Sequence, residues 1–171
     1  MRSTGYISLF MFSLLFLVLS VSTQGKEKAA SSIGRNMEEL KLTTFPGLPE
    51  CMTLAVESGD PATGPAILYV NTTEGCIIPW HWHTANENLM IVSGVAKVEM
   101  KNVKPLTLKS GGFVMLPSKH VHQFKCMEDT CKFFLYTDAP FDIHYVNKKG
   151  KEITPENAMK AVKETAATEM K

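Results

Sequence analysis

Short apolar runs separated by turn-forming residues dominate the chain from about residue 43 to residue 146. The run at 95–101 alternates, with Ala96, Val98 and Met100 on one face of a strand and charged residues on the other. Many short strands with regular turn signals are typical of an all-β sandwich or barrel. The predicted strands are 66–70, 76–83, 88–92, 95–101, 106–109, 113–116, 120–126, 132–137 and 141–146.

The strand predicted at 88–92 lacks this alternation. It is apolar at four successive positions, 89–92, so both of its faces are expected to be covered. Other large apolar side chains of the predicted strands should also fill the barrel interior. The residues expected in the core are Met90, Met100, Met115, Phe133 and Leu135.

The first 25 residues have the pattern of a secretory signal peptide. Arg2 is the only charged residue before Lys26, the middle is rich in Leu and Phe, and small polar residues follow from Ser22 on. An uncleaved membrane anchor is the alternative, because an uncharged run of about 20 residues can span a bilayer. We expect a secreted or extracytoplasmic protein, periplasmic in a bacterium, with no stable membrane association after cleavage.

The rest of the 171 residues is expected to form one domain, because no repeat, charge run or linker divides it. The predicted segments are a signal peptide at 1–25, a polar arm at 26–42, a β-barrel at 43–147, and a C-terminal helix and tail at 148–171. Thr154 can cap that helix, with Pro155 at its first position. A formal net charge of +1 gives no basic footprint, so nucleic acid is not expected as a partner.

Four cysteines remain after the predicted cleavage, Cys51, Cys76, Cys126 and Cys131, and they allow three pairings. Disulfides persist in the compartments to which exported chains are delivered. Cys126 and Cys131 flank a polar turn between two apolar strands, so a cross-strand bond between them is feasible. Two buried free thiols are the alternative. Zinc binding by cysteine is disfavoured, because no CxxC pair occurs.

Histidines carry the candidate chemistry, because four of the five fall within residues 81–122. His81 and His83 are two apart, so both point to the same face of a strand. Glu87 follows after a short turn, and His122 belongs to a later strand together with His120. Three imidazoles and a carboxylate suit a divalent first-row cation that keeps positions open for water or substrate. An HxH pair alone is more often structural, so the surrounding spacing decides.

That spacing matches two known motifs. The first cupin motif, G(X)5HXH(X)3,4E(X)6G, is met at Gly75, His81, His83, Glu87 and Gly94. The second, G(X)5PXG(X)2H(X)3N, is met at Gly111, Pro117 and His122. Lys119 stands where this motif has glycine, and Cys126 where it has asparagine. Over roughly residues 60–146 the chain therefore resembles the cupin superfamily, and in particular its small single-domain metal-binding members.

The resemblance implies an all-β fold, a single-domain cupin jelly-roll β-barrel with a short C-terminal helix. It implies one divalent transition metal (Fe, Mn, Ni, Cu or Zn) held by His81, His83, Glu87 and His122. A quercetin dioxygenase-like enzyme would act on a small oxygenated organic molecule, with Glu87 as the catalytic residue, although isomerases and lyases also share this fold. The alternative is a non-catalytic module that binds or senses a small ligand through the metal. The resemblance also implies a homodimer.

Residues next to this set have other expected roles. His120 should lie outside the ligand set, and Trp80 and Trp82 should pack on the far side of their strand, because their parity is opposite to that of the histidines. Asn86 and Asn88 flank Glu87 and are expected to orient it. A surface hydrogen bond is the simplest role for Asp142 and His144.

Overall fold

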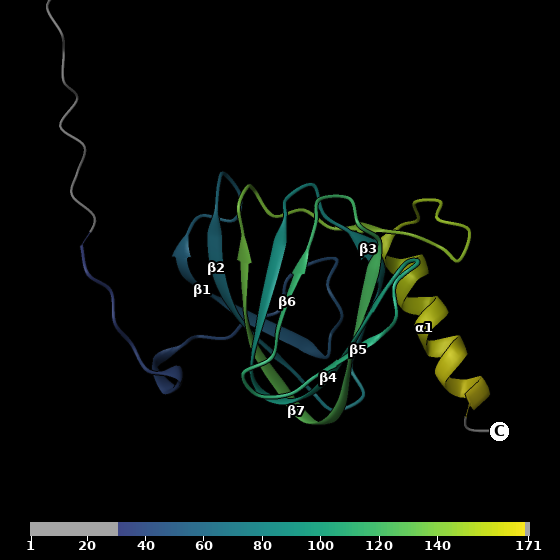
Figure 1. Cartoon of the computed structure of the whole chain (residues 1–171), viewed down its shortest axis with the longest axis horizontal. Helices are drawn as coiled ribbons and strands as arrows, with labels where there is room; N and C mark the ends of the chain where they lie inside the picture. Colours follow the sequence, from purple (N-terminus) through teal and green to yellow (C-terminus); the bar gives the residue numbers. More distant parts are fainter. Residues whose placement is uncertain (1–30, 170–171) are drawn as a thin grey trace, which may run out of the picture. The chain divides into compact units, whose positions relative to one another are not determined.

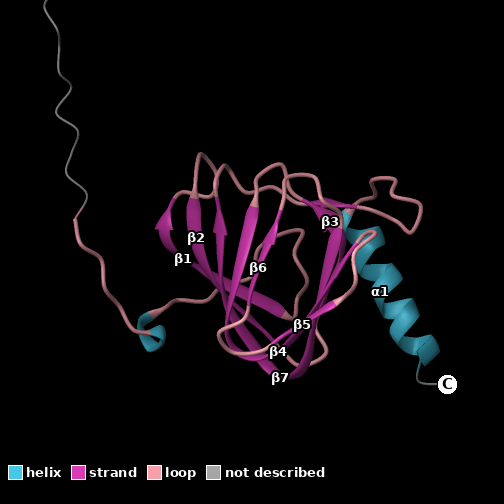
Figure 2. Cartoon of the chain, in the orientation of Figure 1, coloured by secondary structure: helices cyan, strands magenta, loops and turns pink. Residues whose placement is uncertain are grey.

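The computed structural model describes residues 31–169, so the predicted signal peptide lies outside the described residues. The chain divides into two units, Met1–Gly34 and Arg35–Lys171, and the second contains every described helix and strand (Figures 1 and 2). These elements are η1 Met37–Glu39, β1 Met52–Gly59, β2 Ala66–Thr72, β3 Ile77–Trp82, β4 Glu87–Met100, β5 Leu106–Leu108, β6 Phe113–Leu116, β7 His122–Thr137, β8 His144–Tyr145 and α1 Pro155–Glu169. Among the described residues, no helix combines the length and apolarity needed to cross a bilayer.

Two long strands, β4 and β7, organise the barrel. They pair with each other along most of their length, and each contributes its two halves to the two walls of the barrel (Figure 1). One wall has the order β1-β2-β7-β4-β6, and the other has β5-β4-β7-β3-β8. All pairs are antiparallel, which confirms the predicted jelly-roll β-barrel with one short C-terminal helix.

Both long strands bend at the same place, at the bottom of the view in Figure 1. The register of the β4–β7 pair shifts around Gly94, which has φ +84° and where a Cβ would lie 2.7 Å from the Thr130 carbonyl oxygen. The prediction of four separate strands was therefore wrong: 88–92 and 95–101 are one strand, as are 120–126 and 132–137. The turn-forming residues at this point mark a bulge and not the end of a strand. β4 and β7 bend together, so their pairing continues on both sides of the bulge.

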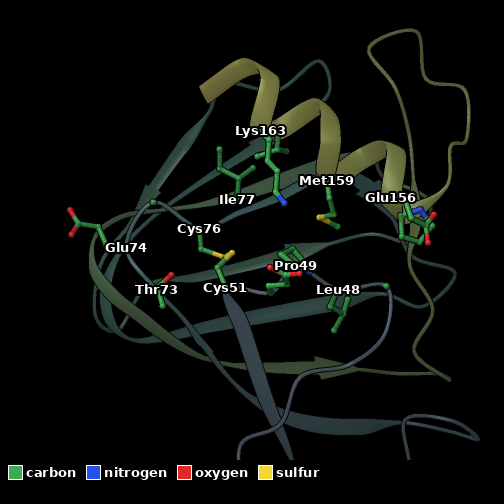
Figure 3. A pocket seen from close by; sticks show the side chains of 15 residues that line it. Leu48, Pro49, Cys51, Thr73, Glu74, Cys76, Ile77, Glu156, Met159 and Lys163 are labelled. Carbon is green, nitrogen blue, oxygen red and sulfur yellow. A yellow bond between two sulfur atoms is a disulfide. The ribbon is translucent and has the colours of Figure 1, made fainter. Parts of the chain in front are cut away.

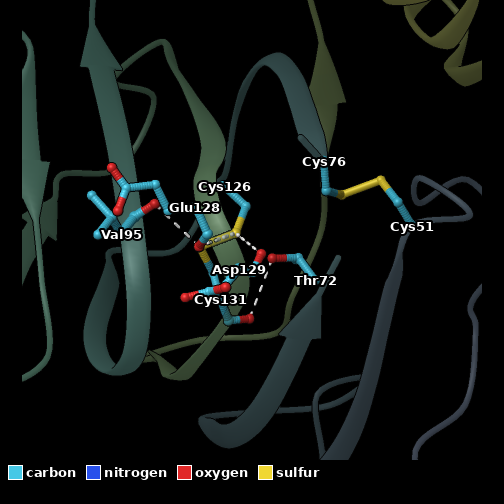
Figure 4. Close-up of a disulfide and its surroundings, with 8 residues drawn as sticks. All are labelled: Cys51, Thr72, Cys76, Val95, Cys126, Glu128, Asp129 and Cys131. Atoms are coloured by element: carbon cyan, nitrogen blue, oxygen red, sulfur yellow. Dashed lines mark hydrogen bonds between the residues drawn. A yellow bond between two sulfur atoms is a disulfide. The ribbon is translucent and has the colours of Figure 1, made fainter. Parts of the chain in front are cut away.

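Two disulfides lie near this bent end, Cys51–Cys76 and Cys126–Cys131 (Figure 4). The predicted Cys126–Cys131 bond is confirmed, but it closes the bulge within β7 and does not cross a hairpin. Backbone hydrogen bonds between Cys126 and the Gly75–Cys76 segment join the two bonded regions. No free thiol is left among the four cysteines. Disulfides of this kind indicate an oxidising, extracytoplasmic environment.

The apolar core lies between the two walls and includes Leu68, Leu89, Phe124, Phe133 and Leu135. Two methionines expected there are not core residues, since Met90 is 38% exposed and Met115 is 51% exposed. Both lie on the outer face of β4 and β6, where Met90 is directly opposite Phe113. Four successive apolar residues in 89–92 therefore do not mean two covered faces, because Met90 faces outward.

The chain on either side of the predicted strands also differs from expectation. β1 was not predicted as a strand, although its residues Met52 and Leu54 are buried and it pairs with β2 along its length. The strand predicted at 141–146 is reduced to the two residues of β8, with an isolated bridge at Val146. The helix is confirmed: Asn157 N–H donates to the Thr154 hydroxyl (3.4 Å), and Ala158 is buried.

A cavity of about 420 Å³ separates α1 from the Cys51–Cys76 bond (Figure 3). Met159 and Lys163 point from the helix toward the barrel, and Pro49 and Ile77 line the opposite side. None of the candidate metal ligands lines this cavity. It is thus a separate feature from the site described next.

Candidate metal centre

The four predicted ligands come from three strands and from the first residue after β3, His83, and they meet inside the barrel. His81 lies near the end of β3, directly opposite His122 at the start of β7, and Glu87 is the first residue of β4. One ligand atom from each of His81, His83, Glu87 and His122 lies within 4.8 Å of the others, and this is the one such group in the described part of the chain. The four residues are 2–4% exposed. Positions far apart in sequence thus form one buried cluster.

Each histidine of the cluster is oriented by a backbone carbonyl. His81 Nδ1 lies 2.6 Å from the Pro79 oxygen, His122 Nδ1 lies 2.8 Å from the His120 oxygen, and His83 Nδ1 bonds the Asp142 oxygen. A carbonyl oxygen only accepts hydrogen bonds, so each Nδ1 carries a proton and donates it. In a neutral imidazole the Nε2 lone pair is then free to bind a cation. All three rings have the tautomer that a metal site of this kind requires.

Lone pairs converge where a cation would lie. His83 Nε2 is 3.5 Å from Glu87 Oε1, and His122 Nε2 is 3.2 Å from Glu87 Oε2. Both of these nitrogens are buried without a hydrogen-bond partner. Acceptor atoms facing one another in a dry interior repel, unless a cation or a proton lies between them. The donor set therefore fits a first-row transition metal, which imidazole and carboxylate ligands bind well.

Electrostatics favour the metal-binding forms of Glu87 and His81. Burial alone would raise the pKa of Glu87, but attraction to His83 and a hydrogen bond with His122, which act when these rings carry a positive charge, outweigh it and lower that pKa below its usual value. Burial lowers the pKa of His81 well below its usual value, and repulsion from His122 and His83 lowers it further. An anionic Glu87 and a neutral His81 at neutral pH are the forms in which these residues ligate metals.

Comparison with known proteins gives the family. The family model for the cupin domain (Cupin_2) matches residues 68–137. Residues 68–137 form a domain of the cupin superfamily. A comparison with curated protein sequences gives no match.

Solved cupin-like structures share the fold at low sequence identity. RemF, a polyketide cyclase from Streptomyces resistomycificus, is 15% identical, with a TM-score of 0.58 over 68% of this chain and 87% of that one. An RmlC-like cupin from Ralstonia eutropha is 14% identical, with a TM-score of 0.58 over 81% and 88%. KdgF from a Halomonas species is 16% identical, with a TM-score of 0.52 over 60% and 92%. These similarities concern the fold.

One departure from the second cupin motif has a structural explanation. Lys119 occupies the glycine position of that motif with φ +61°, the left-handed conformation that glycine adopts without strain. Its N–H donates to the His83 carbonyl oxygen (2.8 Å), which connects the turn before His122 to the segment that directly follows β3. The turn is therefore kept despite the lysine. At the other departure, Cys126 is taken up by a disulfide.

Hydrogen bonds of polar side chains join the three loops next to the cluster of candidate ligands. Asn86 accepts from the Ser118 N–H (2.9 Å), and its side-chain amide donates to Asp138 (2.6 Å). The Ser118 hydroxyl donates to the Thr84 carbonyl oxygen (2.7 Å). The expectation that Asn86 and Asn88 orient Glu87 directly was wrong. Asn86 fixes the loop between His83 and Glu87, whereas Asn88, next to the inward Glu87, lies on the outer face opposite Met115.

Asp142 has a role that the sequence did not reveal. Its carboxylate accepts from the Thr84 N–H (2.7 Å) and lies 3.2 Å from His144 Nε2, which is the surface pair expected from the sequence. Its backbone carbonyl also orients His83. Because any residue offers a carbonyl, no residue type marks such a position.

Other expected neighbours lie away from the cluster. His120 is outside it, with Nε2 at 3.3 Å from the Lys101 carbonyl oxygen. Trp82 stacks on His144 at 3.9 Å between ring centres, on the far side of β3 from the ligands. Phe124 is buried against Phe133 and belongs to the core. The set that converges is thus the set that the motif spacing selected.

Proposed function

We propose that this cupin binds one divalent transition metal through His81, His83, Glu87 and His122, and uses it on a small oxygenated organic molecule. The observation that carries the proposal is the convergence of Nε2 lone pairs and a carboxylate, within 4.8 Å of one another, in a buried site. When bound, the metal would act as a Lewis acid for a substrate oxygen or, if redox-active, support dioxygenase-like chemistry.

The ligands lie in largely apolar surroundings. Each ligand is nearly fully buried, and Phe141 packs against the His83 ring at 5.1 Å between ring centres. Glu87 is the one carboxylate of the cluster, and we infer that it takes a proton from a bound substrate.

A non-catalytic binding module is the second candidate. Besides the four cluster residues, the buried side chains of the described barrel that carry an oxygen or nitrogen atom are Thr72, Thr137, Tyr69 and Tyr145. The Tyr145 hydroxyl donates to the Gly47 carbonyl oxygen. The described interior therefore holds no further carboxylate, histidine or lysine that could act as a dedicated acid or base separate from the ligands. This observation favours either Glu87 in two roles or a site that binds without turnover.

We also propose that residues 1–25 are removed on export and that the mature protein begins with the polar arm. The apolar leader, which carries only the charge of Arg2, supports export, and the two disulfides agree with an oxidising destination. N-terminal sequencing of protein from a secreting host tests the cleavage, and a leader retained in the mature chain would contradict it.

Metal analysis tests the central proposal. Protein purified with its disulfides intact should contain about one equivalent of transition metal, and the double variant His81→Ala, His83→Ala should contain none. His120→Ala and His144→Ala are matched controls that should keep the metal, since both histidines lie outside the cluster. Absence of metal from the wild type, with no rise in melting temperature when metal is added, would refute the site.

Oxygen uptake separates the enzyme from the binding module. Metal-loaded protein is incubated with flavonols, diketones and related carbonyl compounds while dissolved oxygen is followed. Consumption that is lost in Glu87→Gln supports the dioxygenase-like reading. A saturable binding isotherm without turnover supports the module.

A further inference from the structure

One buried hydroxyl near the metal cluster has no partner. The side chain of Thr137, the last residue of β7, is 0% exposed, and its Oγ1 makes no hydrogen bond. Buried polar atoms are normally satisfied, and an orphan in a well-ordered strand lowers stability. Its presence calls for a physical reason.

The register of the barrel places Thr137 beside the cluster. It is directly opposite Glu87 of β4 on one side and Ala66 of β2 on the other. Opposite residues of an antiparallel pair share a face, with Cβ atoms about 4.5–5.5 Å apart. Glu87 points inward to the histidines, so Thr137 does too. Ala66, on the other side, is small and buried.

None of these neighbours takes up the hydroxyl. The two carboxylate oxygens of Glu87 face His83 and His122, at 3.5 and 3.2 Å, and neither accepts from Thr137. Ala66 has no polar side-chain atom. The hydroxyl therefore remains a donor without an acceptor on the face of the barrel that carries Glu87.

Thr72 shows that this barrel can satisfy a buried threonine. It is also 0% exposed, yet its Oγ1 donates to the carbonyl oxygen of Cys131 at 3.3 Å, near the bent end (Figure 4). Thr72 and Thr137 are the same residue type and are equally buried, but only the Thr72 hydroxyl makes a hydrogen bond. The orphan is thus specific to the position next to the cluster.

We propose that Thr137 donates a hydrogen bond to an oxygen atom of the small ligand held at the metal cluster, and so selects for ligands with a carboxylate or other anionic oxygen. This inference rests on the proposed metal site. The hydrogen bond from Thr137 would favour a ligand with an acceptor oxygen over a ligand without one. A hydroxyl is a good donor to an anionic oxygen, and in a buried site such a bond is strong.

Titration of the metal-loaded protein with acetate tests the inference. Cobalt(II) replaces the native metal, and acetate binding is followed by the visible spectrum. Thr137→Val, which keeps the shape and removes the hydroxyl, should weaken acetate binding about tenfold, the size expected for one hydrogen bond. Thr137→Ser should restore it, and the matched control Thr72→Val should leave it unchanged. Equal acetate affinity in Thr137→Val and wild type would overturn the inference.

Thermal unfolding of metal-free protein gives an independent readout. Thr137→Val should melt at or above the wild-type temperature, because it removes an unsatisfied group, whereas Thr72→Val should melt lower, because it removes a bond that is made. A drop in Thr137→Val equal to that in Thr72→Val would mean that the hydroxyl already has a partner, and the inference would fail. If cobalt does not bind the wild type, the proposed metal site fails, while the melting comparison still decides whether the hydroxyl is an orphan.

Discussion

The two ends of this barrel are held together by different chemistry. At the bent end, β4 and β7 turn through Gly94 and a bulge, and both disulfides lie there. At the open end, three loops are joined by hydrogen bonds between polar groups, with Asn86, Ser118 and Asp138 at their centre. The buried histidines and Glu87 belong to this second end.

The bent end contributes mainly to the stability of the fold, whereas the open end carries the candidate site. Buried, partly unsatisfied polar groups such as His83 Nε2 and Thr137 Oγ1 lower the stability of a domain. Covalent bonds and apolar packing at the bent end offset that loss without touching the site. The open end instead uses hydrogen bonds between polar groups, which fix the loops next to the ligands. Variants at the bent end should therefore change unfolding, and variants at the open end should change binding.

The largest loss of stability is expected from removing the disulfides. They close loops of 25 and 5 residues in sequence separation. In the chain-entropy model, Cys51→Ala with Cys76→Ala should lower the free energy of unfolding by about 3.5 kcal/mol, and Cys126→Ala with Cys131→Ala by about 2 kcal/mol. Urea unfolding measures both. Each folded variant should keep its metal content, and loss of metal from a folded variant would break the separation between the two ends.

Gly94→Ala should have an effect on unfolding between those of the two disulfides. Alanine would have to adopt φ +84°, and its Cβ would come within 2.7 Å of a backbone oxygen that is not free to move. We expect a loss of about 2–3 kcal/mol from the left-handed strain and the clash together. Gly64→Ala is the control, because nothing lies within 4 Å of its Cβ position. Comparable urea midpoints for the two variants would show that the bend tolerates a side chain.

Features that depend on residue type and local spacing could be predicted from the sequence. The barrel and its helix followed from alternation, turn residues and the cap at Thr154. The cluster followed because His81, His83 and Glu87 lie within one short stretch, so local spacing alone brings them together, and only His122 had to come from a second motif. The Cys126–Cys131 bond was predicted as a bond across a hairpin, but it closes a bulge. A sequence separation of five residues fits both structures.

Features that depend on pairing partners could not be predicted. Ser93-Gly94 has the composition of a turn, and only the simultaneous bend of β7 keeps β4 in one piece. Met90 has the composition of a core residue, and its exposure depends on which elements cover the outer face. The Asp142 carbonyl that orients His83, and the inward position of Thr137, follow from register and backbone path. A single sequence gives no sign of either.

Asn86→Ala should have the smallest effect on stability and the clearest effect on binding at the open end. Asn86 is half-buried and joins the loop that bears His83 and Glu87 to Ser118 and Asp138, so its loss frees that loop without opening the core. Metal affinity should fall about tenfold, the lower end for groups that support metal ligands, as measured by competition with a chromogenic chelator. Asn88→Ala is the matched control, because Asn88 is on the outer face and should leave the affinity unchanged. If Asn86→Ala instead lowers the urea midpoint as much as Gly94→Ala does and leaves metal affinity intact, the open end is a structural element like the bent one.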